Sequence, residues 1–313
     1  MVATDDSQPF AHQPVMVDEV VTLIAEVPAG EVLDATVGGG GHADAVLSSR
    51  PDLTVIGIDR DPIALAAAEQ RLAPHGARVR LHRARFDRLG EVLDALGVAD
   101  LSGFVFDLGV SSPQLDDPER GFSYRHDGPL DMRMDPDATT TAAEVVNAYD
   151  RDRLTALLRR NGDERFAPRI ARAIVEARPI DGTVRLADIV VSAIPAGARR
   201  TGGHPAKRTF QAIRIEVNDE LRVIEPALES ALDALRVGGR GIVLTYHSGE
   251  DRIVKGVFRN RVRSPDPPGL PVAVATPSFA NIRPLARRPT PAEAERNPRA
   301  ASARLRSIER LAA

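Results

Sequence analysis

The amino-acid sequence predicts an α/β fold, in which a parallel sheet is flanked by helices and interrupted by an inserted helical domain. Three observations lead to this prediction. Short apolar strands alternate with helical segments over residues 31–107, four glycines follow the first strand, and more than 100 residues separate the fourth strand from the fifth. Alternation of strand and helix is typical of parallel sheets, because each helix carries the chain back to begin the next strand. The 43% hydrophobic content is sufficient for a normal core.

The predicted strands are apolar and end at turn-forming or acidic residues. They cover 31–35, 53–58, 79–81, 103–107 and 241–246. Helices are expected between them at 42–49, 63–72 and 89–96. A simple crossover between parallel strands needs only about a dozen residues. The long segment before the last of these strands must therefore contain an insertion.

The inserted segment has a helical pattern. Thr141 and Glu144 have the spacing of a capping box, and Asp150 is placed to cap a helix that ends near Gly162. Further helices are expected at 166–177 and 183–194, a loop at 196–205, one long or broken helix at 210–237, a short strand near 272–275 and a final helix at 301–311. We therefore expect a sheet domain formed by 1–135 and 210–313, with a helical domain inserted at 136–209.

Composition excludes several classes of protein. The chain has no cysteine, so disulfides, cysteine zinc sites and thiol nucleophiles are excluded. His12, His204 and His247 lack the close spacing typical of metal ligands, and we expect no metal. The first residues do not resemble a signal peptide, and no apolar stretch reaches the length of about 18 residues that a membrane helix needs. We therefore expect a cytoplasmic protein without a membrane partner.

Positive charge is concentrated in two parts of the chain. The net charge is −3, yet residues 256–313 carry 11 arginines against 4 acidic residues. The segment 196–214 contains five cations and no acid, namely Arg199, Arg200, Lys207, Arg208 and Arg214. A basic tail and a basic loop on an acidic body can follow a phosphate backbone. A solvated surface in an arginine-biased chain is the alternative, because the chain has only two lysines.

Carboxylates follow three of the predicted strands. Asp34, Asp59 and Asp107 each stand where an apolar run ends. Because the carboxyl ends of parallel strands meet at one edge of the sheet, where ligands bind, the three acids are expected to converge there. A ring of acids suits a cationic cofactor, and S-adenosylmethionine is one.

The segment Asp34-Ala-Thr-Val-Gly-Gly-Gly-Gly-His42 joins the first strand to a helix. Its glycines fit a dinucleotide-binding fingerprint, with Asp59 at the distance expected for a ribose-binding acid. NAD enzymes and S-adenosylmethionine enzymes both use such a turn, and it also occurs without a ligand. A carboxylate at Asp34 would face the pyrophosphate of NAD unfavourably but could pair with the methionyl ammonium. Phe86 is placed either to pack on adenine or to serve as an ordinary core aromatic.

Seven blocks of the chain occur in the same order in a known family. They are His12-Gln-Pro-Val15, Asp34 to His42, Gly57-Ile-Asp-Arg-Asp-Pro62, Asp107 to Asp135, His204 to Leu221, His247-Ser-Gly-Glu-Asp-Arg252 and Asn297 to Arg306. On these blocks the chain resembles, from end to end, the bacterial 16S ribosomal RNA cytosine-N4 methyltransferases of the MraW type. The resemblance implies a Rossmann-like class I methyltransferase sheet with an inserted substrate-recognition domain. It also implies S-adenosylmethionine as the methyl donor and a cytidine in the decoding region of 16S rRNA as the acceptor. The 30S subunit is the expected partner, and free rRNA stays open as the alternative substrate.

The resemblance also implies which residues bind the cofactor. They are Gly40, Gly41, His42, Asp59, Phe86, Asp107 and Gln114, to which the charge argument adds Asp34. Three places depart from the family pattern. Gly249 stands where a leucine is usual, Tyr246 replaces a phenylalanine-type aromatic, and the pair Arg287-Arg288 replaces two lysines. The cofactor residues themselves are unaffected by these departures.

Asp107 is also the candidate catalytic residue. The exocyclic nitrogen of cytosine is a poor nucleophile, because its lone pair is delocalised, so a hydrogen-bond acceptor for the amino group would help. Asp107 stands where many amino methyltransferases place such an acceptor. His12 and His247 are expected to border the target base. An NAD-dependent oxidoreductase and a non-catalytic ribosome-assembly factor are the alternative functions, and a homodimer remains open.

Overall fold

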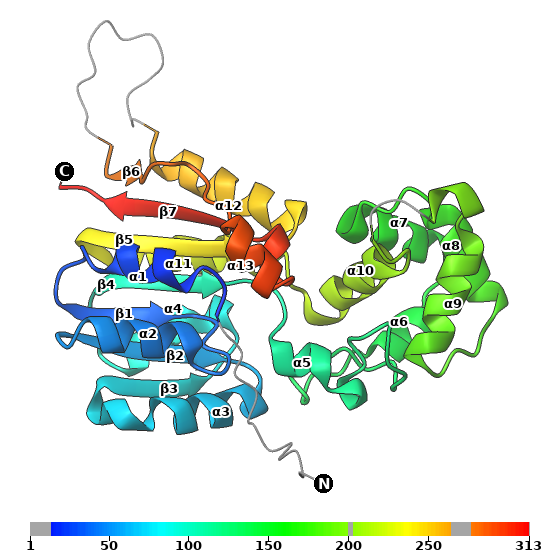
Figure 1. Cartoon of the computed structure of the whole chain (residues 1–313), viewed down its shortest axis with the longest axis horizontal. Helices are drawn as coiled ribbons and strands as arrows, with labels where there is room; N and C mark the ends of the chain where they lie inside the picture. The colour runs from blue at the N-terminus through cyan, green and yellow to red at the C-terminus, as the bar shows by residue number, and fades with distance from the viewer. Residues whose placement is uncertain (1–13, 200–202, 264–276, 313) are drawn as a thin grey trace, which may run out of the picture. The chain divides into compact units, whose positions relative to one another are not determined.

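The protein consists of two compact units, each described here by itself. A computed structural model describes residues 14–199, 203–263 and 277–312. The first unit, here called the sheet unit, contains Met1–Gly109 and Ile224–Ala313, and the second, the helical unit, contains Val110–Val223 (Figure 1). The chain thus leaves the sheet unit after its fourth strand and returns to it before the fifth.

The sheet unit is built on a seven-stranded sheet in the order β3-β2-β1-β4-β5-β7-β6 (Figure 1). The strands are β1 (Gly30–Asp34), β2 (Leu53–Asp59), β3 (Val79–Arg83), β4 (Leu101–Asp107), β5 (Leu235–Thr245), β6 (Phe279–Asn281) and β7 (Arg304–Arg310). The first five run parallel, whereas β7 pairs antiparallel with both β5 and β6. The predicted parallel sheet and its Rossmann-like class are confirmed.

Helices cover the sheet in two layers. They are α1 (Val17–Ile24), α2 (Gly41–Ser49), α3 (Pro62–Leu72), α4 (Leu89–Ala95), α11 (Ile224–Ala234), α12 (Ser248–Arg261) and α13 (Pro291–Arg296). The helices α1, α2 and α3 pack side by side on the face toward the viewer in Figure 1, while α11 contacts both α4 and α12. Every residue of β4 before Asp107 is buried, as expected for a central strand covered on both faces.

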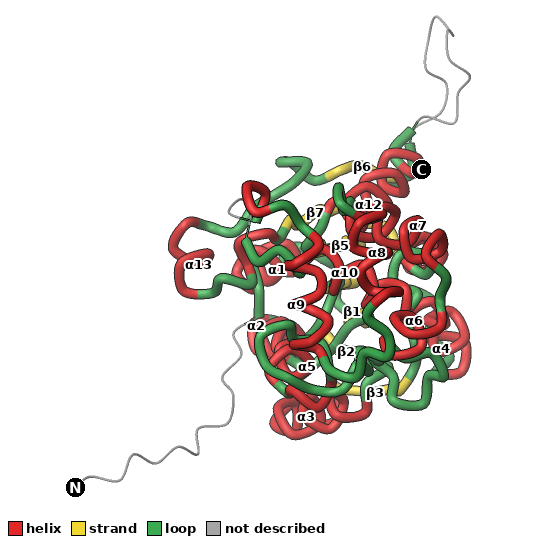
Figure 2. Tube along the Cα trace, turned by 90° about the vertical axis from the view of Figure 1, so that its right-hand side faces the viewer, coloured by secondary structure: helices red, strands yellow, loops and turns green. Residues whose placement is uncertain are grey.

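The helical unit contains α5 (Ser112–Asp116), α6 (Ala142–Ala148), α7 (Arg151–Gly162), α8 (Ala167–Glu176), α9 (Thr183–Ala193) and α10 (Lys207–Asn218). Figure 2 shows these elements as helix and loop. Thr141 and Asp150 accept hydrogen bonds from the backbone of the helices that follow them, as predicted. Buried leucine and isoleucine side chains from α7, α8, α9 and α10 form the core of this unit.

The boundaries of the units differ from the expected domain boundaries at 136 and 209. The helical unit extends further in both directions, to Val110 and Val223. Leu130, Met132 and Met134 pack into its core, and Asn218 at the end of α10 bonds the backbone of Met132 and Met134. Apolar side chains of residues 110–135 and 210–223 pack against the helices of the helical unit, and composition alone does not indicate this packing.

One predicted element was wrong. The helix expected at 301–311 is the strand β7, in which the buried Leu305 and Ser307 alternate with the half-buried Arg304 and Arg306 and the backbone of β5 supplies pairing partners. The long or broken helix expected at 210–237 is broken: α10 ends at Asn218, where Asp219 adopts a left-handed conformation, and α11 begins at Ile224. Its last residues differ from the expectation, because 235–237 belong to β5, which also contains Gly238 and Gly239.

Two further expectations concern the strand near 272–275 and membrane association. Residues 272–275 lie outside the described residues. In the described part of the chain, no helix is both long enough and apolar enough to span a bilayer.

Candidate active site at the carboxyl edge of the sheet

Three carboxylates lie at adjacent strand ends of the sheet unit. Asp34 ends β1, Asp59 ends β2 and Asp107 ends β4, and β1 lies between the other two strands. The charges of Asp107 and Asp59 are close enough to raise the pKa of Asp34. The structure therefore brings these three predicted residues together at one edge.

Asp34 is a buried carboxyl group with little internal compensation. Burial raises its pKa from 3.8 to about 7, against the opposing effects of nearby His42 and of the hydrogen bond from the Thr36 backbone. The Thr36 N–H lies 3.2 Å from Asp34 Oδ1. No arginine or lysine among the described residues forms an ion pair with Asp34. The ionised form is therefore costly until a cation approaches.

Asp59 holds the glycine turn in place. Its Oδ2 accepts a hydrogen bond from the Gly38 N–H at 3.0 Å, and its Oδ1 accepts one from the Asp61 N–H at 2.9 Å. Burial nevertheless raises the pKa of Asp59. Each carboxylate oxygen has a second lone pair, so both can still accept hydrogen bonds from ligand hydroxyl groups.

The glycine turn combines backbone freedom with open space. Gly38 and Gly40 have positive φ values of 52° and 79°, which favour glycine. A Cβ at Gly39 would meet nothing within 4 Å, whereas a Cβ at Gly40 would lie 3.1 Å from Leu72 and one at Gly41 would lie 3.1 Å from Pro14. The first part of the turn thus faces open space for a ligand, and the second part packs closely against its neighbours.

Asp107 is held by two hydroxyl groups and is partly accessible. Its backbone N–H donates to Thr36 Oγ1 at 2.6 Å, and its Oδ1 accepts a hydrogen bond from the Tyr246 hydroxyl at 2.6 Å. Burial, followed by the charge of Asp107, raises the pKa of Tyr246 well above 10, so Tyr246 remains a donor. The Asp107 side chain keeps 27% of its surface exposed. This carboxylate is therefore oriented and can still reach a ligand.

His42 contributes an acceptor beside Asp107. The ring is buried, and its Nε2 lies 2.9 Å from the carbonyl oxygen of Val15. A carbonyl oxygen only accepts, so Nε2 carries the proton and Nδ1 is an acceptor in the neutral ring. Nδ1 lies 3.8 Å from Asp107 Oδ2, beyond hydrogen-bond distance. Oδ2 of Asp107 is placed to accept from N–H or O–H groups of a ligand, and Nδ1 of His42 is so placed when the ring is neutral.

Phe86 begins a short 3₁₀ turn after β3 and is half-buried. Its ring packs edge-to-face against Phe106 of β4, with 5.6 Å between the centroids. The ring thus has a core contact, as the second expectation for Phe86 holds, and it also keeps an accessible surface. An accessible aromatic ring near the strand ends is suited to packing on a purine.

His247 and Gln114 have contacts within their own units. His247 caps α12: its Nδ1 accepts the Gly249 N–H at 3.1 Å, while Glu250 bonds back to the His247 backbone. Gln114 belongs to α5 of the helical unit, where its Oε1 accepts the Ser111 N–H at 3.0 Å. His12 and Arg200 lie outside the described residues.

Most of the predicted RNA-binding cations in the helical unit already have protein partners. Arg214 forms two hydrogen bonds of 2.8 Å with the carboxylate of Glu220. Arg199 donates to the backbone oxygens of Ile194 and Ser192, at the end of α9. Arg208 donates to the Asp163 carbonyl, whereas Lys207 is exposed at the start of α10. Lys207 is thus the described member of this set whose charge is most accessible.

Sequence reasoning missed two residues that shape the site. Thr36 was visible between Asp34 and the glycines, but its bond to Asp107 depends on the pairing of β1 with β4. Tyr246 was noted only as a departure from a family pattern. Its position directly after β5 is the signal that could have indicated a role at the strand ends.

The site fits a cationic ligand that carries hydrogen-bond donors and an adenine ring. Acceptors predominate at Asp34, Asp59 and Asp107, and a phosphate group would be repelled by them. Open space at Gly39 and the accessible ring of Phe86 provide room and an aromatic contact. An acidic site of this kind on a Rossmann-like sheet is that of an S-adenosylmethionine-dependent methyltransferase.

Comparisons with known proteins identify the family. The model of the MraW methylase family matches residues 9–311, and this chain belongs to that family. Ribosomal RNA small subunit methyltransferase H of Mycobacterium sp. (strain KMS) is 53% identical over 311 residues, covering 96% of this chain and 84% of the relative. The protein of the same name from Thermobifida fusca (strain YX) is 52% identical over 308 residues, covering 96% and 93%.

A solved structure of an rRNA methylase from Streptococcus thermophilus is also similar to this chain. It is 14% identical, has a TM-score of 0.44, and the match covers 97% of this chain and 100% of that one. The family assignment does not depend on this likeness.

Proposed function

We propose that this enzyme transfers a methyl group from S-adenosylmethionine to the N4 amine of a cytidine in the decoding region of 16S rRNA, within the 30S subunit. The observation that carries the proposal is the cluster of Asp34, Asp59 and Asp107 beside the glycine turn. Relatives named ribosomal RNA small subunit methyltransferase H support the rRNA substrate. The motif blocks of the sequence support cytidine N4. We expect the protein to act in the cytoplasm, where ribosomal subunits are found.

The residues for cofactor binding divide by chemistry. Asp34 is the candidate for the methionyl ammonium, Asp59 for the ribose hydroxyls, and Phe86 for adenine, with Gly40, Gly41 and His42 shaping the turn. When bound, S-adenosylmethionine supplies an electrophilic methyl group on a positively charged sulfur. Binding of a cation beside Asp34 also removes the cost of ionising that buried carboxyl group.

Asp107 is the candidate acceptor for the cytosine amino group. The Tyr246 hydroxyl donates to Oδ1, and Oδ2 lies on the side of His42. An amino proton bonded to Oδ2 would direct the nitrogen lone pair away from the carboxylate. Much of the rate enhancement would then come from alignment of the reacting atoms. The base must first be lifted out of any stack to reach this edge.

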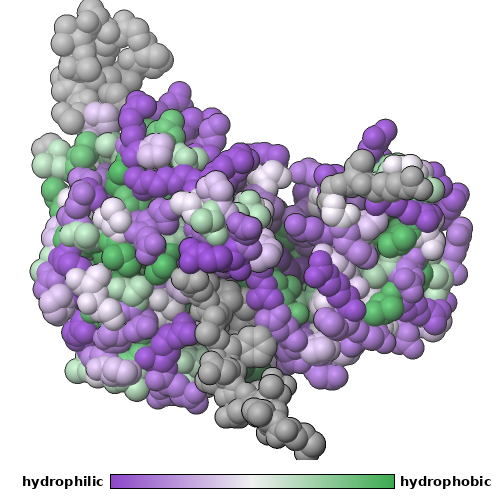
Figure 3. Space-filling model, viewed as in Figure 1, coloured by the Kyte–Doolittle hydropathy of each residue, from purple (hydrophilic) through white to green (hydrophobic). Residues whose placement is uncertain are grey.

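The basic C-terminal segment divides into internal and external cations. Arg304 and Arg306 pair with Asp251, and Arg261 pairs with Glu229 and Asp233. Arg252, Lys255 and Arg259 are exposed on α12 at spacings that place them on one side of the helix. The surface over α12 is largely hydrophilic in Figure 3. This row supports binding of an RNA phosphate backbone more directly than the total charge does.

The test is methyl transfer to purified, unmethylated 30S subunits, followed by mass spectrometric mapping of the modified nucleotide. We expect methyl groups on N4 of one cytidine in the decoding region. Asp107→Asn, which has the same shape without the charge, should lower kcat more than it weakens substrate binding. Transfer to another base would refute the proposed specificity. Absence of transfer, with normal binding to the particle, would favour the assembly-factor alternative.

A further inference from the structure

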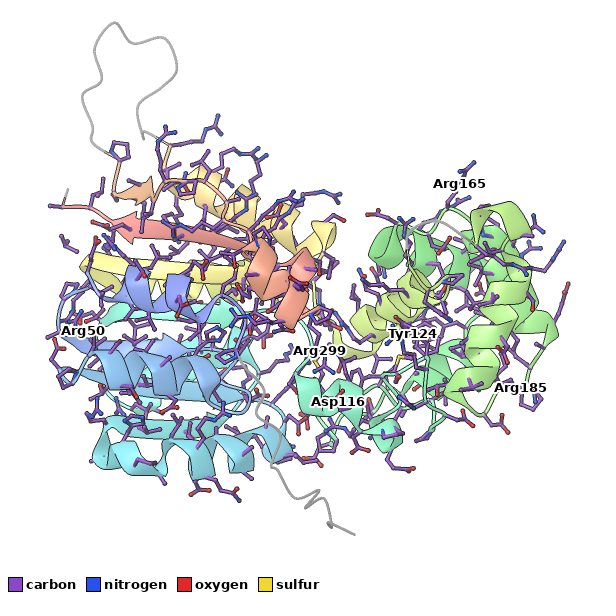
Figure 4. All side chains as sticks on the ribbon, in the orientation of Figure 1. Arg50, Asp116, Tyr124, Arg165, Arg185 and Arg299 are labelled. Carbon is purple, nitrogen blue, oxygen red and sulfur yellow. The ribbon has the colours of Figure 1, made fainter. Side chains whose placement is uncertain are left out.

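Two aromatic rings from distant parts of the sequence stack in the helical unit. Tyr124 and His204 are nearly parallel, with 4.5 Å between their centroids and 14° between their planes. Phe210, which is buried in α10, packs edge-to-face against Tyr124 at 5.7 Å. Tyr124 is labelled in Figure 4. The stack is thus anchored in the core of the unit through Phe210.

Exposure increases along this stack. Phe210 is buried, Tyr124 is half-buried and His204 is exposed. The His204 ring is also fixed in orientation, because its Nδ1 accepts the Ala206 N–H at 3.3 Å. One face of the His204 ring is against Tyr124, and the ring as a whole remains accessible to solvent. The exposed His204 is therefore the member of the stack that a further flat ring would meet.

Two cationic residues are close in sequence to the stacked residues. The Arg125 guanidinium carbon lies 5.9 Å from the centroid of the Tyr124 ring, and the Arg125 side chain is exposed. Lys207 follows His204 by three residues, and its backbone N–H donates to the His204 carbonyl. An aromatic platform between positive charges is the arrangement by which proteins hold unpaired nucleotides: the ring stacks on the base, and the cations contact the adjacent phosphates.

We propose that the outer face of His204, backed by Tyr124, is a stacking platform for one unpaired base of the RNA substrate, with Arg125 and Lys207 contacting its flanking phosphates. This inference rests on the proposed function, since it assumes an RNA substrate. It adds a second point of contact, in the helical unit, to the acidic site of the sheet unit. The platform recognises a π-face, so it accepts purines and pyrimidines alike.

The test uses the full-length protein and a fluorescein-labelled single-stranded RNA of the decoding-region sequence, with variants that carry one abasic site at successive positions. His204→Ala should lower the affinity for the intact strand about 5- to 100-fold, the range known for loss of one base–aromatic contact. His204→Phe keeps a flat ring and should retain most of the affinity. Arg153→Ala, which removes another exposed cation–π pair of the same unit, is the matched control and should have little effect.

The abasic series separates stacking from a merely structural role. At one position, an abasic site should weaken wild-type binding, and His204→Ala should then cause no further loss. The inference would be overturned if His204→Ala lowered the affinity equally for the intact RNA and for every abasic RNA. It would also be overturned if His204→Ala did not lower the affinity for the intact strand. Failure of the proposed function would look different, because the wild-type protein would then neither bind this RNA nor methylate 30S subunits.

Discussion

Asp34 and Asp251 are two buried carboxylates of the sheet unit with opposite environments. Asp251 receives hydrogen bonds from Arg306 at 2.7 Å and Arg304 at 2.8 Å. Burial would raise the pKa of Asp251, but these arginines lower it below the usual value. Asp34 is more deeply buried, and its pKa is raised to about 7. The protein supplies cations to Asp251, whereas no arginine or lysine among the described residues forms an ion pair with Asp34, which is the carboxylate that we propose for a cationic ligand.

The largest effect is expected from Asp34→Asn on the stability of the ligand-free protein at high pH. A carboxyl group whose pKa is raised in the folded state stabilises it below about pH 4, and this contribution is lost as the pH rises through about 7. The shift from 3.8 to about 7 corresponds to about 4 kcal/mol. The neutral amide of the variant has no such cost. Above pH 8, the free energy of unfolding of Asp34→Asn should therefore exceed that of wild type by up to this amount.

Denaturant unfolding at pH 5 and pH 8.5 measures this difference. The excess stability of Asp34→Asn should be small at pH 5 and large at pH 8.5. Asp18→Asn, at an exposed position, is the control and should show no such trend. A variant that is equally or less stable than wild type at pH 8.5 would show that Asp34 is compensated within the protein.

A smaller change of opposite sign in the free energy of unfolding is expected from a substitution of Asp251. Asp251→Asn leaves two arginines without their partner, and it should lower the free energy of unfolding by about 3 kcal/mol at neutral pH. The pKa of Asp251 is lowered, so its contribution is present above about pH 4 and disappears as the pH falls through the lowered value. Asp219→Asn removes an exposed pair with Arg222 and should cost less than about 1 kcal/mol. If thermal melts showed the same loss of stability for Asp251→Asn and Asp219→Asn, the buried ion pairs of Asp251 would be no more important than the exposed pair of Asp219.

The smallest of the three effects concerns ligand affinity. Asp59→Ala should weaken S-adenosylmethionine about 10- to 100-fold, because hydrogen bonds to a charged acceptor are lost, and should leave RNA affinity nearly unchanged. Asp59→Asn keeps one acceptor oxygen for the Gly38 or Asp61 backbone and should show a milder loss. Filter binding with each ligand makes the comparison. Equal weakening of both ligands would mean that Asp59 supports the whole fold instead of the cofactor site.

Local patterns were sufficient to predict the sheet and the acidic edge. An apolar run that ends in aspartate, a glycine turn and a helix cap involve neighbouring residues, so Asp34, Asp59 and Asp107 could be placed from the sequence. The strand β7 could not be predicted, because its pairing with β5 joins segments about 60 residues apart. The Arg214–Glu220 pair likewise depends on the left-handed turn at Asp219. Charges that the sequence assigned to RNA are therefore partly used within the fold.

Cationic-ligand binding at the acidic strand ends is tested most directly by calorimetric titration of the full-length protein with S-adenosylmethionine and, in parallel, with NADH. We expect S-adenosylmethionine to bind wild type, to bind Asp34→Asn more weakly, and NADH not to bind either protein. The affinity ratio of the two proteins should shrink below pH 7, where Asp34 becomes protonated in the free enzyme. Binding of NADH in preference to S-adenosylmethionine, or equal affinity of both proteins for S-adenosylmethionine at pH 8.5, would contradict this assignment.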